Sequence, residues 1–401
     1  MIELLKINDI GEAKRLIKGI GVDSVAIGLM DKKAVCYAVR VFGCRFYHAN
    51  ILKQEALSLG IDVAVEKGVV TAQTQITDCL IMGDAKRLIK LADKLSIQDF
   101  AFLKKLSFRL KKALEGVLEG SFVWRVKDRV FDLKDDYLIM GILNVTPDSF
   151  SDGGEFNSID AALKRTEQLI EEGADIIDVG GESTRPGSEF VPLDEELKRV
   201  VPVVEAIKRR FDVVVSVDTY KSRVAEEVLD RGVEIINDIS GLGFDDRLVD
   251  VLSNSDCGIV DMHIKGTPKD MQKDPTYEHL LGEINDRFEG ILNRLKEAGI
   301  DEERVVLDPG VGFGKRFEDN LTILNHLEAF RVWGRPILIG TSRKSFIGAV
   351  LGVGNPKDRL FGTVASNVVA LLRGASIFRV HDVKAHREAL RLAKAIVDET
   401  F

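Results

Sequence analysis

Residues 211–241 read FDVVVSVDTYKSRVAEEVLDRGVEIINDISG, and this stretch decides the fold. Two runs rich in β-branched residues, Val213–Thr219 and Glu234–Ser240, are expected to be strands, and the segment between them has helical spacing. A strand, a helix and a second strand within about 30 residues predict parallel strands joined by a crossover. Each of these strands ends in polar residues, among them Asp218 and Asn237.

The same unit recurs from residue 137 to the end of the chain. Eight units in about 265 residues predict an α/β fold of the closed (β/α)8 TIM barrel type. An open doubly wound sheet would have fewer strands and a G-x-G-x-x-G turn, which the sequence lacks. Besides the two strands above, strands are expected over Tyr137–Val145, Asp175–Gly181, Gly258–Ile264, Arg304–Val311, Pro336–Ser342 and Ser376–Val383.

The first third of the chain follows another pattern and predicts a small N-terminal α/β or α+β domain over residues 1–120. Expected helices are Ile10–Ile20, Ala49–Leu59, Ala85–Leu95 and Phe100–Leu118, and expected strands are Ser24–Met30, Ala34–Val41, Ile61–Val65 and Asp78–Ile81. Residues 121–136 predict a connecting hairpin that caps the barrel of residues 137–401. The N-terminal domain carries no recognisable chemical motif.

Composition narrows the classes of function. Apolar residues make up 45% of the 401 residues and charged residues 30%, which suits a globular chain with a substantial core. The formal net charge of -8 argues against a nucleic-acid or anionic-membrane surface, since either needs a broad excess of Lys and Arg. The N-terminus lacks a basic segment followed by an apolar one, so a cytoplasmic protein is expected. The cysteines, Cys36, Cys44, Cys79 and Cys257, lack zinc-site spacing and are expected to be buried free thiols.

Polar loops follow the first two strands of the barrel. Asn144 begins the first loop and offers an amide oxygen to a metal or an amide NH2 group to phosphate. Arg185 in the second loop is a cation suited to an anionic substrate. The alternatives are an Asx turn for Asn144 and a solvated surface charge for Arg185.

Carboxylate, amide and thioether groups end the middle strands. Asp218 and Asn237 can pair with the ring nitrogens and amino group of a heterocycle, or cap helices instead. Met262 can form a polarizable wall beneath an aromatic ring, or pack in the core. His263 can be an interior histidine whose ring nitrogens are hydrogen-bonded within the protein.

The sixth strand leads into LDPGVGFGK, residues 307–315, which superficially resembles a phosphate loop. Pro309 stands where that loop needs glycine, and Arg316 follows Lys315 where it needs Ser or Thr, so a nucleoside triphosphatase is excluded. Asp308 can accept hydrogen bonds from a guanidine-like ring edge, although an Asp-Pro-Gly turn is the alternative.

The last two strands end in cations. Arg379 and His381 are two positions apart, so both side chains point to the same side of the strand and form a clamp suited to diphosphate. Lys344 adds a positive charge between the heterocycle and a second substrate. For Arg343 and Lys344, exposed charges at the start of a helix are the alternative.

These motifs, taken in order, resemble those of dihydropteroate synthase. They are LNVTPDSFSDGG, GGESTRPG, SVDT, NDISG, MH, LDPGVGFGK, TSRKSF and RVHD, and they cover residues 137–401. The resemblance implies a (β/α)8 barrel, usually a homodimer, that joins a dihydropterin diphosphate to p-aminobenzoate and releases diphosphate with Mg2+ assistance. One departure is Ile264 and Lys265 after Met262-His263, where the family usually has Met and then Arg or Gln; neither position carries an assigned role.

The resemblance also implies roles for particular residues. Residues implied to act in catalysis are Asp218, Asp308, Lys344, Arg379 and His381. The pterin would lie among Asp218, Asn237, Met262, Asp308 and Lys344, and Asn144 would ligate the metal. The diphosphate and the closing loops would involve Asn144, Asp152, Thr184, Arg185, Arg379 and His381, and p-aminobenzoate would contact Phe150, Pro186, Phe313, Lys344 and Ser345.

Two rival functions share part of this pattern. A pterin-dependent methyltransferase would share Asp218 and Asn237, but it needs neither the diphosphate clamp nor the two closing loops. A non-catalytic pterin-binding protein would be expected to lack the leaving-group residues Arg379 and His381, which are present. The sequence therefore favours the synthase.

Overall fold

The structure is a computed structural model that describes residues 2–3, 5–7, 9–145, 155–184 and 187–399. The chain divides into two compact units, Met1–Gly120 and Ser121–Phe401.

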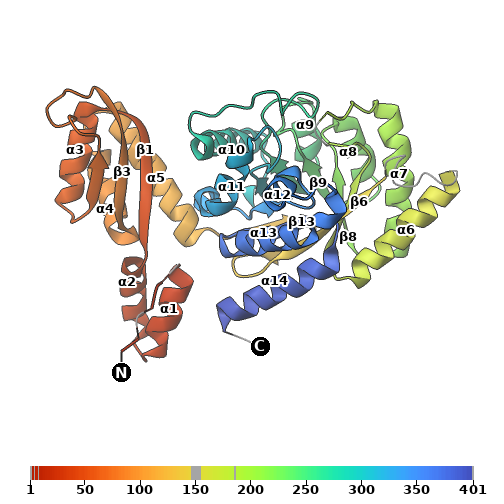
Figure 1. Ribbon diagram of the computed structural model, residues 1–401, viewed down its shortest axis with the longest axis horizontal. Helices are drawn as coiled ribbons and strands as arrows, with labels where there is room; N and C mark the ends of the chain where they lie inside the picture. Colours follow the sequence, from red (N-terminus) through yellow and green to blue (C-terminus); the bar gives the residue numbers. More distant parts are fainter. Residues whose placement is uncertain (1, 4, 8, 146–154, 185–186, 400–401) are drawn as a thin grey trace. The chain divides into compact units, whose positions relative to one another are not determined.

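In the second unit, the described residues form an eight-stranded parallel sheet (Figure 1). The strands are β6 (Leu138–Asn144), β7 (Ile176–Gly180), β8 (Val214–Asp218), β9 (Ile235–Asp238), β10 (Gly258–Met262), β11 (Val305–Asp308), β12 (Leu338–Ile339) and β13 (Ile377–Val380). Their order is β11-β10-β9-β8-β7-β6-β13-β12, and a parallel bridge between Leu307 and Ile337 joins the two ends. The predicted (β/α)8 barrel is therefore confirmed, although the seventh strand is much shorter than the expected Pro336–Ser342.

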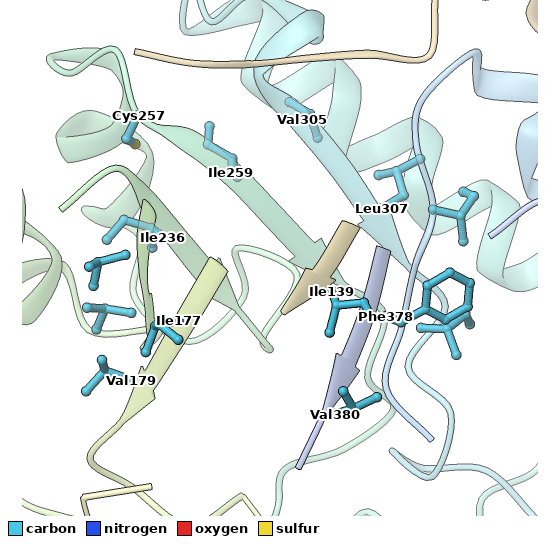
Figure 2. Close-up of a cluster of buried hydrophobic side chains, with 14 of the residues drawn as sticks. Ile139, Ile177, Val179, Ile236, Cys257, Ile259, Val305, Leu307, Phe378 and Val380 are labelled. Carbon is cyan, nitrogen blue, oxygen red and sulfur yellow. The ribbon is translucent and has the colours of Figure 1, made fainter. Parts of the chain in front are cut away.

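Helices surround the sheet, and every second side chain along a strand packs against them. They are α6 (Glu155–Glu171), α7 (Leu193–Arg210), α8 (Ser222–Leu229), α9 (Leu248–Ser253), α10 (Leu280–Glu297), α11 (Phe317–Asn325), α12 (Ser345–Leu351), α13 (Leu360–Leu372) and α14 (Val383–Asp398), with short 3-10 helices η2 (Glu302–Arg304), η3 (Leu327–Trp333) and η4 (Pro356–Arg359). Outward-facing strand residues such as Ile177, Ile236 and Ile259 belong to the large buried cluster between the strands and these helices (Figure 2). Alternate residues therefore point into the barrel.

A hairpin of β4 (Val123–Val126) and β5 (Arg129–Asp132) precedes the barrel. Trp124 and Val126 are fully buried and share one apolar cluster with the inward-facing residues near the amino ends of the strands, such as Ile176 and Val214. The Trp124 indole N–H donates to the Arg304 carbonyl at 3.0 Å, so the polar end of the ring is satisfied. The hairpin thus fills the end of the barrel opposite the polar strand tips.

The N-terminal unit contains α1 (Ile10–Gly19), α2 (Ser24–Ala34), β1 (Cys36–Arg45), α3 (Phe46–Leu57), β2 (Asp62–Val65), β3 (Ile76–Asp84), α4 (Ala85–Ser96) and α5 (Ala101–Glu119). The strands form an antiparallel sheet in the order β1-β3-β2. One prediction is wrong, because Ser24–Met30 is helical rather than extended. The Asp23 carboxylate caps this helix by accepting from the Val25 N–H at 2.9 Å, a local bond that outweighs the β propensity of Val25 and Ile27.

Two further predictions can be checked here. Cys44, Cys79 and Cys257 are buried free thiols as expected, whereas Cys36, at the first residue of β1, is exposed. Among the helices that the structure describes, none has the length and apolar composition needed to cross a membrane.

Candidate active site

Polar residues form a row across neighbouring strands at the carboxyl ends of the barrel. Asn144 is in register with Gly180, Gly180 with Asp218, and Asp218 with Asn237. A Cβ atom added at Gly180 would lie 3.7 Å from Asn144 Oδ1 and 3.8 Å from Asp218 Oδ2. The glycine therefore leaves a small space between an amide oxygen and a carboxylate oxygen.

Arg379 lies between two buried carboxylates. Its Nε donates to Asp178 Oδ2 at 2.6 Å, and its Nη2 donates to Asp218 Oδ2 at 2.7 Å. The Asn237 amide also donates to Asp178 Oδ2, at 3.3 Å, which joins β7, β8, β9 and β13 in one network. Because the fork of the guanidinium is planar and rigid, these bonds fix the position of both carboxylates.

Burial sets the charge balance of this network. Burial raises the pKa of Asp218 to about 7; the Arg379 guanidinium opposes the rise and the nearby Asp178 carboxylate adds to it. Burial alone would lower the pKa of Arg379, but Asp178 and Asp218 raise it above its ordinary value, so Arg379 is a permanent cation. Asp218 can consequently gain or lose a proton near neutral pH.

Asp308 and Lys344 face each other across the next part of the site. Asp308 Oδ1 accepts from the Gly310 N–H at 2.7 Å, and burial raises the pKa of this carboxyl while Lys344 opposes the rise. Burial lowers the pKa of Lys344 to about 8, with Asp308 opposing the change. The Lys344 ammonium donates to the Val311 carbonyl and lies 4.7 Å from the centre of the Phe313 ring. The Lys344 ammonium, the Asp308 carboxylate and the Phe313 ring therefore lie close together in this part of the site.

The buried side chain of Met262 packs close to Gly310. A Cβ atom added at Gly310 would lie 3.2 Å from Met262 Cγ. His263 is buried, and its Nδ1 lies 2.9 Å from Lys315 Nζ. Burial, helped by the Lys315 charge, lowers the pKa of His263 to about 2, so the ring is neutral. His263 is therefore a buried histidine whose ring lies within hydrogen-bond distance of Lys315.

His381 is two residues beyond Arg379 and just past the end of β13, where Ser342 Oγ lies 2.9 Å from its Nδ1. The Ser342 hydroxyl also accepts the His381 backbone N–H at 3.2 Å, so one side chain orients both the ring and the backbone. The neighbouring Arg343 is engaged elsewhere, in a two-pronged pair with Asp382 at 3.1 and 2.6 Å. Arg343 is therefore held by Asp382, whereas Ser342 orients His381, and Asp178 and Asp218 orient Arg379.

Comparison with known proteins identifies the family to which this arrangement belongs. Residues 140–381 match the sequence pattern of the family described as pterin binding enzyme. The dihydropteroate synthase of a Synechocystis species is 42% identical over 271 residues, which cover 68% of this chain and 94% of that protein. The chain belongs to the dihydropteroate synthase family. A solved Burkholderia cenocepacia dihydropteroate synthase complexed with 7,8-dihydropteroate is 40% identical, with a TM-score of 0.63, and the match covers 69% of this chain and 97% of that one.

For one longer relative of the dihydropteroate synthase family, the match extends from the barrel into the N-terminal unit of this chain. A probable bifunctional folylpolyglutamate synthase/dihydropteroate synthase of Haloferax volcanii is 37% identical over 359 residues. The match covers 87% of this chain, more than Ser121–Phe401 contains, and 42% of that protein. The N-terminal unit therefore has a counterpart in another member of the dihydropteroate synthase family.

Two further predicted site residues lie outside the strands of the barrel. Thr184 is half-buried in the segment after β7, and Ser345 is exposed at the first residue of α12. The predictions for Phe150, Asp152, Arg185 and Pro186 fall outside the residues that the structure describes.

The sequence interpretation gave no role to Asp178 or Lys315, which contact the predicted site residues Arg379 and Phe313. Asp178 lies two residues before Gly180 on β7, so both residues face the same side of the strand. This spacing indicates that the Asp178 side chain points into the barrel. Lys315 is almost completely buried and donates to the carbonyls of Gly310 and Phe313 at 3.0 and 2.9 Å. The sequence excluded a nucleotide loop and assigned Lys315 no other role, because its backbone contacts form only when the loop folds.

The site offers oxygen ligands for a divalent cation. The amide oxygen of Asn144 and the carboxylate of Asp218 border the space above Gly180. Among the described residues, no three His, Cys, Asp or Glu side chains are grouped closely enough to hold a metal ion by themselves. The amide and carboxylate oxygens are donor types that Mg2+ prefers, and Mg2+ commonly takes most of its ligands from substrate phosphates and water.

Proposed function

We propose that this chain condenses 6-hydroxymethyl-7,8-dihydropterin diphosphate with p-aminobenzoate to give 7,8-dihydropteroate and diphosphate. The observation that carries the proposal is the contact between Arg379 and Asp218. It joins the residue proposed to hold the leaving group to a residue proposed to hold the pterin ring. A protein that merely bound a pterin would have no use for that connection.

The pterin ring is proposed to lie against the inward-facing carboxylates and amide. Asp218, Asn237 and Asp308 present acceptors and donors that match the ring nitrogens and the exocyclic amino group of a pterin. Met262 provides a polarizable surface for the ring face. These residues are carried by strands, so their geometry is set before the substrate arrives.

The diphosphate is proposed to bind beside Arg379 and His381. The guanidinium keeps its charge at every physiological pH, and Ser342 holds the imidazole in place. Asn144 would ligate Mg2+ through its amide oxygen. Bound Mg2+ would supply positive charge that neutralises the leaving diphosphate.

The reaction is proposed to be dissociative. The bond between the pterin methylene carbon and the diphosphate oxygen breaks first, and its electron pair leaves with the diphosphate. The ionised carboxylates of Asp218 and Asp308 stabilise the resulting pterin cation. The amine of p-aminobenzoate, held near Phe313 and Lys344, then attacks the methylene carbon and loses one proton, so no covalent enzyme intermediate forms.

The proposal is tested by following diphosphate release. Purified protein should release diphosphate when the pterin diphosphate and p-aminobenzoate are both present, and should form dihydropteroate in equal amount. Methyl transfer from methyltetrahydrofolate without this condensation would instead support the rival methyltransferase. Binding of the pterin diphosphate without any turnover would support the non-catalytic rival.

A homodimer is also proposed, and it is supported by exposed apolar side chains on the last helices of the barrel. Phe361 on α13 is 84% exposed, and the other exposed apolar residues nearby in the sequence are Val350, Leu351, Val369, Leu372, Leu392, Ile396 and Val397. So many exposed apolar residues on consecutive helices indicate an interaction surface. Sedimentation equilibrium should give a dimer for the wild type and a monomer for Phe361→Glu; a wild-type monomer would remove this part of the proposal. The cytoplasmic location stays a prediction.

A further inference from the structure

Lys221 is a buried lysine placed three residues after Asp218, at the start of the helix that follows β8. Its ammonium donates to Glu182 Oε2 at 2.5 Å and to the Val191 carbonyl at 2.7 Å, and it also pairs with Glu196. The side chains of Glu182 and Glu196 are 7% and 1% exposed. The proposed mechanism gives this ion cluster no role.

The partners of Lys221 come from both ends of the segment between β7 and α7. Glu182 lies two residues beyond the end of β7, while Val191 lies two residues before α7 and Glu196 lies in its first turn. The ring of Phe190, next to Val191, lies 4.5 Å from the Lys221 ammonium. A lysine attached to β8 therefore holds the entry and the exit of the segment that carries Thr184.

The entry end has a second support. The Tyr220 hydroxyl lies 2.9 and 3.1 Å from the two carboxylate oxygens of Glu182. Glu182 therefore takes hydrogen bonds from two consecutive residues after β8, and these bonds fix its side chain. Because burying an ion pair costs desolvation free energy that its attraction barely offsets, a gain in stability is a weak explanation for the cluster.

We infer that Lys221 is a positioning residue that fastens the β7–α7 segment to the strand carrying Asp218; the effect on catalysis rests on the proposed function. Asp218 and Lys221 are close in the chain, so any shift of the segment relative to Lys221 is a shift relative to Asp218. The pterin-holding side chains sit on strands and do not depend on this tether. Loosening it should therefore impair use of the pterin diphosphate, whose diphosphate is proposed to involve Thr184, while leaving binding of the pterin ring intact.

The informative variant is Glu182→Gln, which releases the entry end. It leaves Lys221 paired with Glu196 as a neutral buried pair, so the barrel avoids the unpaired charge that Lys221→Met would create. The matched control is Glu195→Gln, one residue before Glu196, because Glu195 pairs with Arg199 near the surface and contacts neither Lys221 nor Glu182. Lys221→Arg is the conservative variant that keeps the charge.

Two measurements decide the inference. Hydrogen exchange without substrate should be about tenfold faster at Ser183 and Thr184, next to the weakened contact, in Glu182→Gln, since a charge-assisted hydrogen bond becomes a neutral one. The KM for the pterin diphosphate should rise by about tenfold by the same reasoning, while the Kd for 6-hydroxymethyl-7,8-dihydropterin, which has no diphosphate, should stay within about twofold. Glu195→Gln should match the wild type in both measurements. Lys221→Arg should keep part of the wild-type protection against hydrogen exchange.

Two outcomes would overturn the inference. Wild-type exchange and wild-type KM in Glu182→Gln would show that the tether does not hold the segment. A parallel loss of pterin affinity and melting temperature would show a general structural role. If the wild type itself fails to condense the substrates, the proposed function fails, and hydrogen exchange still decides whether Lys221 fastens the segment.

Discussion

The guanidinium of Arg379 donates to the carboxylate of Asp218 at 2.7 Å, across 161 positions of sequence. The Nε of Arg379 donates to Asp178 Oδ2 at 2.6 Å, so two buried carboxylates share a single cation. The network carries a net negative charge when both carboxylates are ionised. A diphosphate bound at Arg379, as proposed, would therefore compete with Asp178 and Asp218 for the same guanidinium.

This sharing predicts that Arg379 cannot be replaced by lysine. A lysine ammonium keeps the charge but lacks the planar fork that reaches both carboxylates. We expect Arg379→Lys to lower kcat/KM by about 100-fold, the effect typical of losing one stabilising donor in an active site. Diphosphate release measures it, and the control is Arg373→Lys at an exposed arginine on the far end of α13. A rate near that of the wild type would remove Arg379 from the leaving-group site.

The raised pKa of Asp218 predicts a pH dependence of stability. Folding moves this pKa from 3.8 to about 7, so the folded state binds the proton more tightly than the unfolded chain does. The resulting stability is present below the unfolded value and is lost as pH rises through the folded value. The melting temperature should therefore fall less between about pH 4 and about pH 7 in Asp218→Asn than in the wild type. Equal slopes for the two proteins would contradict the assignment.

Features that depend on neighbouring residues in the chain were predictable from the sequence. The barrel followed from repeated strand and helix patterns, and polar residues such as Asp218 and Asn237 marked the strand ends. The error at Ser24–Met30 arose because a single cap, Asp23, decides between helix and strand there. Local propensity carries too little free energy to reveal such a choice.

Features that depend on closing the barrel were not predictable. Arg379 looked like a free cationic clamp, but it meets Asp178 and Asp218 once the sheet curves so that β13, β7 and β8 surround one interior. Lys315 had no predicted role once a nucleotide loop was excluded, but in the folded chain it is buried and donates to the backbone of its own loop. Pairing across the interior has no signature in a short window of sequence.

Lys315 is expected to be essential for the stability of the loop after β11. Its ammonium donates to two loop carbonyls and contacts His263 Nδ1, and burial lowers its pKa to about 7. Lys315→Met would leave these buried acceptors unpaired, at a cost of about 2 to 4 kcal/mol in the free energy of unfolding. Urea denaturation measures the loss, with Lys357→Met at an exposed lysine as control. A loss no larger than that of the control would show that the contacts are dispensable.

Gly310 and Gly352 allow backbone strain to be separated from crowding. Both have a φ of +68°, so alanine at either position should cost about 1 kcal/mol for the left-handed conformation alone. A Cβ at Gly352 would meet no atom within 4 Å, whereas one at Gly310 would lie 1.9 Å from the His263 carbonyl oxygen.

Gly310→Ala must therefore also displace the loop that positions Asp308 and Phe313. We expect it to lose at least about 2 kcal/mol more stability than Gly352→Ala, within the range for overpacked buried sites. Its KM for both substrates should rise, whereas Gly352→Ala should keep wild-type kinetics. Urea denaturation and steady-state assays of the two variants make the comparison. Equal losses would mean that the loop after β11 can move without cost, and that the close approach of Gly310 to the His263 carbonyl does not set the geometry of the site.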